Sequence, residues 1–105
     1  SSIRDKGVNI TTSLQGNLLT LTYNTVVHFN NTDGLTTQKK DHEKISNDGI
    51  NSCLKEMKDM FRDQAERALK VKEMSNTDDI ELISATANSP RKIALYRRKI
   101  IFEIS

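Results

Sequence analysis

One stretch of sustained helical periodicity, residues 46–74, limits what this chain can fold into. Its apolar residues recur at spacings of three and four, which places them on one face of a helix. They are Ile50, Cys53, Leu54, Met57, Met60, Phe61, Ala65, Ala68 and Leu69. Ser46, Asn47 and Asp48 are competent N-cap residues. At about 1.5 Å per residue this segment predicts a helix of about 40 Å, which is long for a small domain.

Two alternating segments before this helix predict a β-hairpin. Residues 8–15 and residues 19–29 alternate apolar with polar side chains, the period of half-buried strands. Gly16 and Asn17 between them suit a two-residue type II′ turn. The expected register pairs Leu14 with Leu19, Thr12 with Leu21 and Ile10 with Tyr23. The apolar side chains of both strands then share one face.

Two further segments are β-prone. Residues 80–87 predict a strand that small residues interrupt, and residues 92–104 predict a long one. Residues 35–38 are either a short third strand or a loop. The sequence therefore predicts an α+β fold: an antiparallel sheet of four to five strands, with one long amphipathic helix packed on one face, in the order ββ(β)αββ.

The last strand has two sets of apolar residues that a regular strand would place on opposite faces. Ile93 and Leu95 are odd-numbered, while Ile100, Phe102 and Ile104 are even-numbered. A β-bulge at Arg97 and Arg98 would bring all five onto one face. Alternatively, the strand is apolar on both sides because it lies centrally in the sheet or in an interface.

Length and composition indicate one soluble domain, residues 1–105. The chain opens with Ser1 and Ser2 rather than Met, which suggests a processed product or a domain excised from a longer chain. The single Cys53 excludes an internal disulfide and favours a reducing compartment. No apolar run is long enough for a membrane span. We therefore expect an intracellular protein, cytoplasmic or nuclear, with no membrane partner.

Residues typical of catalysis or cofactor binding are sparse. Asp41, His42 and Glu43 are adjacent in sequence and do not face one another on a helix. Two histidines and one cysteine show no metal-ligand spacing, and no glycine-rich phosphate loop is present. We expect no catalytic residue, no metal and no cofactor, and we do not expect an enzyme.

The densest charge feature is basic and lies near the C-terminus. It consists of Arg91, Lys92, Arg97, Arg98 and Lys99, with Tyr96 among them. A strand that presents arginine and tyrosine can contact a phosphate backbone and stack a base. The alternative is an edge strand on which positive charge prevents aggregation. The net charge of only +2 gives no global field for nucleic acid. Ser89 precedes Pro90 in a Ser-Pro-x-Lys pattern typical of a proline-directed kinase site.

A sheet covered by a single helix leaves its other face and its edges uncovered. The candidate interface on that second face consists of Val26 and, if the last strand has no bulge, of Ile93, Leu95 and Ile101. We therefore predict a non-catalytic protein-protein interaction or assembly module that acts through its sheet face or edge. Its partner is another protein or a second copy of the chain. The alternative is a nucleic-acid-binding domain that uses the basic C-terminal strand.

Overall fold

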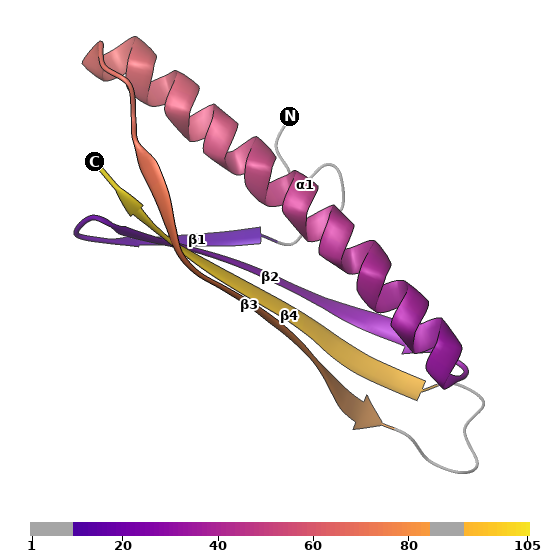
Figure 1. Cartoon of the computed structure of the whole chain (residues 1–105). Helices are drawn as coiled ribbons and strands as arrows, with labels where there is room; N and C mark the ends of the chain where they lie inside the picture. The colour runs from indigo at the N-terminus through magenta and orange to yellow at the C-terminus, as the bar shows by residue number, and fades with distance from the viewer. Residues whose placement is uncertain (1–9, 85–91) are drawn as a thin grey trace.

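The computed structural model describes residues 10–84 and 92–105, and it shows an antiparallel sheet with one long helix against one face (Figure 1). The elements are β1 (Ile10–Gln15), β2 (Leu18–Phe29), α1 (Thr32–Ala65), β3 (Val71–Ser84) and β4 (Lys92–Ile104). The four strands lie in the order β1-β2-β4-β3. The α+β class, the antiparallel sheet and the single long helix are confirmed, with four strands in the order ββαββ.

The N-terminal hairpin has the predicted register. Leu14 pairs with Leu19, and Ile10 pairs with Tyr23. Gly16 has φ of 63°, and Glu66 is the only non-glycine residue in the described segments with positive φ. A positive φ at the first loop position alone is the signature of a type II′ turn. The expected extension of β1 to residue 8 lies outside the described residues.

The predicted bounds of the helix are wrong at its N-terminal end. α1 begins at Thr32, so residues 35–38 are helical and form neither a strand nor a loop. The N-cap is Asn31, whose Oδ1 accepts a hydrogen bond from the main-chain N–H of Gly34 at 2.8 Å. In the N-terminal half of α1, polar residues occupy the side of the helix that faces the sheet. His42 is partly buried there and Ser46 is fully buried. An apolar pattern does not reveal a buried face built from such residues.

The predicted C-terminal end of the helix is also wrong. α1 ends at Ala65, where Glu66 adopts the left-handed conformation and donates its N–H to the carbonyl of Arg62 at 3.0 Å. Lys70 and Ser105 exchange two main-chain hydrogen bonds of 2.9 Å, and the β3–β4 ladder begins directly after them. Pairing with β4 therefore replaces the predicted helix from Lys70 onward, and β3 begins at Val71 rather than at residue 80.

β4 has the predicted bounds and is a central strand, between β2 and β3. Its pairing with β2 runs without interruption through Arg97 and Arg98, so the predicted bulge at these residues is wrong. The register irregularities lie instead in β3. The alternative of a central strand that is apolar on both sides is confirmed.

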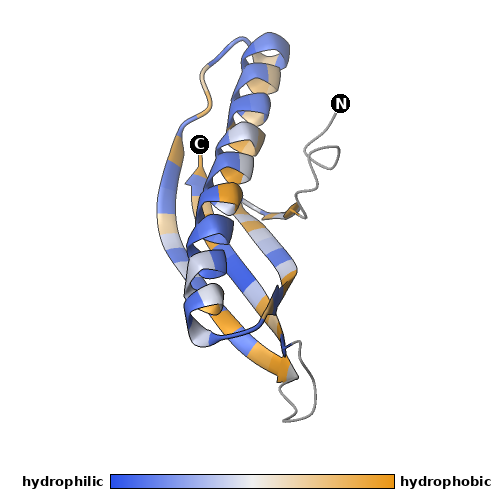
Figure 2. Cartoon of the chain, turned by 90° about the vertical axis from the view of Figure 1, so that its right-hand side faces the viewer, coloured by the Kyte–Doolittle hydropathy of each residue, from blue (hydrophilic) through white to orange (hydrophobic). Residues whose placement is uncertain are grey.

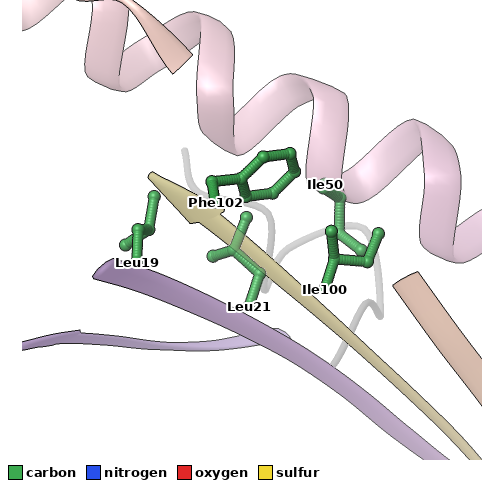
Figure 3. Packing of buried hydrophobic residues seen from close by; sticks show 5 residues of the cluster. All are labelled: Leu19, Leu21, Ile50, Ile100 and Phe102. Atoms are coloured by element: carbon green, nitrogen blue, oxygen red, sulfur yellow. The ribbon is translucent and has the colours of Figure 1, made fainter. Parts of the chain in front are cut away.

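The core lies between α1 and the two central strands. Leu19 and Leu21 of β2 and Ile100 and Phe102 of β4 lie on the side of the sheet that faces α1 and form one cluster with Ile50 of the helix (Figure 3). Each is at least nine-tenths buried, and burying such a side chain contributes about 1.5–3 kcal/mol. Most residues of α1 are hydrophilic (Figure 2). The helix runs diagonally across one face of the sheet, from the end of β2 to the start of β3 (Figure 1).

Candidate interaction surface

We call the sheet face turned away from α1 the open face. It carries the even-numbered residues of β2 and the odd-numbered residues of β4, because the opposite set is buried against α1. All four residues of the predicted interface, Val26, Ile93, Leu95 and Ile101, lie on it. Val26 pairs directly with Leu95, and Ile93 follows at the same end of the strands. Ile101 lies at the other end, beyond Arg97 and Lys99.

Arg97, at the centre of the open face, is paired with acidic residues of β3. Arg97 donates from Nε and Nη2 to the two carboxylate oxygens of Asp79, at 3.0 and 2.9 Å. Glu81 also lies 3.3 Å from Arg97 Nη2. The hydrogen bonds from Arg97 lower the pKa of Asp79. A hollow of about 290 Å³ lies here, and Lys99 is among its lining residues. Two carboxylates thus offset the charge of Arg97.

Tyr96 and Arg98 lie on the opposite face, against α1. Tyr96 is fully buried, its hydroxyl donates to Asp78 Oδ2 at 3.1 Å, and burial raises its pKa to about 12. Arg98 Nη1 donates to the carbonyl of Glu43 and to Ser46 Oγ, both at 3.2 Å. Arg98 therefore joins the centre of the sheet to the middle of the helix.

The residues proposed for nucleic-acid binding thus do not share one surface. Arg97 and Lys99 lie on the open face, Tyr96 and Arg98 face α1, and Lys92 is partly buried opposite Phe29 at the start of β4. The predicted contact at Arg91 and the predicted phosphorylation at Ser89 lie outside the described residues. Binding by the whole set stays a prediction.

A buried polar and aromatic cluster beside Arg98 was not anticipated from the sequence. Tyr23 Oη and His42 Nδ1 are hydrogen-bonded at 2.8 Å, and the rings of Tyr23, His42 and Tyr96 lie with centroids 5.9–6.0 Å apart. Burial lowers the pKa of His42, against an opposing effect of Asp41, and burial raises the pKa of Tyr23. The available signal was spacing, since His42 lies seven residues after Leu35 and four before Ser46. The cluster holds the helix on the sheet.

The two edges of the sheet differ in chemistry. β3 forms one edge, carries Lys72, Glu73, Asp78, Asp79 and Glu81, and has two register irregularities. Charges and irregularities on an edge strand discourage pairing with another strand. β1 forms the other edge with the sequence Ile-Thr-Thr-Ser-Leu-Gln, which contains no charge and no proline, and its pairing with β2 is regular. Of the two edges, as far as the structure describes them, the β1 edge is the one without charged residues or register irregularities.

An apolar groove of about 350 Å³ lies between β1, β2 and the C-terminal half of α1. Its lining includes Leu14 and Met60, whose exposed fractions are 55% and 57%. Cys53 also lines it, and burial together with Glu56 raises the pKa of this thiol. A raised pKa disfavours the reactive thiolate, so we assign Cys53 to packing.

Neither α1 nor any part of it is long and apolar enough to cross a membrane. Within residues 10–84 and 92–105, no three His, Cys, Asp or Glu side chains are placed together to hold a metal. Comparison with known proteins finds no matching family model, no similar curated protein and no similar solved structure.

Proposed function

We propose that this chain is a non-catalytic assembly module that accepts an additional β-strand at the outer edge of β1. The contrast between the two sheet edges carries the proposal. β3 combines charged residues with irregular pairing, whereas β1 is regular and uncharged. An edge of the second kind is a template for another strand.

The hairpin geometry identifies the main-chain groups that such a strand would meet. In a two-residue hairpin the pair that flanks the loop, here Gln15 and Leu18, is hydrogen-bonded, and the pairs alternate from there. Thr11 and Ser13 therefore bond to β2. Ile10, Thr12 and Leu14 direct their N–H and C=O groups to the outer edge. A binding strand would satisfy these groups without disturbing the hairpin.

The groove gives this edge an apolar side. Leu14 and Met60 are both more than half exposed next to β1. A strand added at the edge would place alternate side chains on the same side as Leu14 and cover both residues. Each large apolar side chain buried in this way would contribute about 1.5–3 kcal/mol before the cost of association.

Site-specific photocross-linking in the source cells tests the proposal. A photoreactive amino acid replaces Thr12 at the edge or, as the matched control, Val26 on the open face. We expect a defined cross-linked protein with the probe at position 12 and not at position 26. Cross-links that form only from position 26 would assign binding to the open face. Absence of cross-links from position 12 would contradict the proposal.

The nucleic-acid alternative has one structural support. Arg97, Arg98 and Lys99 all line the same hollow of the open face, although the guanidinium of Arg98 is bonded to α1. Lys99 forms no ion pair with any described residue. The pairing of Arg97 with Asp79 and Glu81 weighs against this alternative, because a phosphate would compete with two carboxylates.

A further inference from the structure

We infer that the strand added at the β1 edge is β1 of a second copy of this chain, paired antiparallel about Thr12. This inference rests on the proposed function and specifies its partner. The result is a two-fold symmetric dimer with one continuous sheet of eight strands. Most soluble oligomers have this kind of closed symmetry, in which one surface meets its own copy.

The main-chain geometry favours this register. Ile10, Thr12 and Leu14 are the residues of β1 whose hydrogen-bonding groups point outward. Antiparallel pairing about Thr12 sets Thr12 opposite Thr12 of the second copy and Ile10 opposite Leu14 of the second copy. All three outward-facing residues then form hydrogen-bonded pairs in both copies, which gives about six main-chain hydrogen bonds. A register centred on Thr11 or Ser13 leaves part of this set unpaired.

The side chains are self-complementary in the same register. β1 reads apolar, polar, polar, polar, apolar from Ile10 to Leu14, so reversal of the strand reproduces the pattern. Ile10 of the second copy would lie beside Leu14, next to the groove that Met60 lines. Thr11 and Ser13 would lie opposite each other on the open face. No charged residue of β1 faces a like charge, because the strand has none.

The expected affinity follows from the size of the contact. One short strand pair and one groove bury less than the roughly 1,600 Å² of a standard stable interface. We therefore expect a dimer that forms at high concentration and dissociates on dilution. Attachment of the chain to a larger assembly would strengthen this contact by raising its effective concentration.

Sedimentation equilibrium of the purified chain over a wide concentration range tests the dimer. The weight-average mass is expected to rise toward twice the chain mass of 11.9 kDa. Thr12→Lys should keep the chain at its own mass, because the dimer would bring the two introduced charges together. Val26→Lys adds the same charge on the open face and should leave the dimer intact. The reverse result, with only Val26→Lys dissociating the dimer, would overturn the inference.

Thr12→Pro is a second edge variant that separates main-chain from side-chain effects. Proline removes the outward N–H of residue 12 and leaves the β1–β2 hydrogen bonds in place. We expect loss of the dimer with an unchanged far-UV circular dichroism spectrum. A dimer that persists with this spectrum would count against edge pairing. If Thr12→Pro alters the spectrum, the sedimentation result for Thr12→Lys decides whether the dimer forms through this edge.

Disulfide trapping checks the register independently. In a Cys53→Ser background, Thr12→Cys should form a disulfide-linked dimer on mild oxidation. Cα atoms of a hydrogen-bonded antiparallel pair lie about 5.5 Å apart, within disulfide range. Val26→Cys in the same background is the control and should remain monomeric. Equal cross-linking of both variants would contradict the register.

The proposed function and this inference fail in different ways. A wild-type chain that stays at its own mass at every concentration overturns self-pairing. The wider proposal then stands or falls with photocross-linking at position 12, which detects a different protein as readily as a second copy.

Discussion

Arg98 Nη1 lies 3.2 Å from Ser46 Oγ, which joins the middle of the central strand β4 to a serine of α1 that is fully buried. The same nitrogen donates to the carbonyl of Glu43, and Arg98 Nε and Nη2 donate to Asn76 Oδ1. One guanidinium thus connects α1, β4 and β3. Arg97, the preceding residue of the strand, points to the opposite face and is exposed to solvent.

Arg98→Ala is expected to lower the free energy of unfolding by about 2 kcal/mol, because it removes several charge-assisted hydrogen bonds from a partly buried site. Arg97→Ala is the matched control and should destabilise the chain much less, because its ion pairs are exposed to solvent and exposed ion pairs contribute little to stability. Urea unfolding monitored by circular dichroism measures both. Equal destabilisation by the two variants would contradict the assigned role of Arg98.

His42 should make stability depend on pH. Its pKa is lower in the folded chain than the ordinary value of 6.5, because burial disfavours the charged ring. The unfolded chain therefore binds the proton more readily, and stability is full above pH 6.5 and falls as the pH drops through the folded pKa. The urea concentration at the midpoint of unfolding should therefore decrease when the pH is lowered from about 7.5 to about 5.

His42→Gln should reduce that decrease, since it removes the titrating group. His28→Gln, at an exposed position of β2, is the matched control and should retain the wild-type pH dependence. If both variants keep the full decrease, the effect arises elsewhere in the chain.

The two tyrosines should titrate late. The pKa of Tyr96 is about 12 and that of Tyr23 is also raised, both chiefly by burial. The stability that these two groups contribute is complete below pH 10.0, and it is lost as the pH rises through their pKa values in the folded chain. Phenolate absorbance should therefore appear above pH 10.0 and together with alkaline unfolding. A tyrosine that titrates reversibly near its ordinary value while the chain remains folded would disprove the packing of this cluster.

Nucleic acid should bind no more tightly than a non-specific ligand, with a Kd on the order of 10⁻⁴ M at physiological salt. The physical reason is that Arg97 is already paired and Arg98 faces α1. Fluorescence anisotropy with labelled single- and double-stranded probes measures this affinity. Much tighter binding that weakens with salt and is lost in Lys99→Ala would favour the nucleic-acid alternative.

Local chemistry decided how much of the fold could be predicted. Gly16 and Asn17 specify the hairpin register through the turn alone, and the β-prone composition of residues 92–104 predicts β4. The bounds of α1 depend on tertiary contacts, because His42 and Ser46 are polar residues on its buried face and residues 71–73 pair with β4 instead of extending the helix. The candidate site also depends in part on tertiary contacts, which the sequence pattern does not show.

Alternation placed Val26, Ile93, Leu95 and Ile101 on one face, and the structure agrees. The sequence did not separate Arg97 from Arg98, because the side of β4 that α1 covers depends on the rest of the sheet. Nor did it distinguish the two edges, because strand order in space does not follow from strand order in the chain. β3 and β4 are neighbours both along the chain and in the sheet, whereas β2 and β4 are neighbours only in the sheet.

Residue-resolved amide exchange along β1 tests the central claim most directly. Thr12 directs its N–H to the outer edge of β1, and Ser13 directs its N–H to β2. Exchange at Thr12 therefore reports on the edge, and exchange at Ser13 reports on the hairpin. We predict fast exchange at Thr12 in the dilute chain, protection of Thr12 at high concentration, and constant protection of Ser13. A Thr12 amide whose exchange does not change with concentration, whether fast or slow throughout, would contradict self-pairing at this edge.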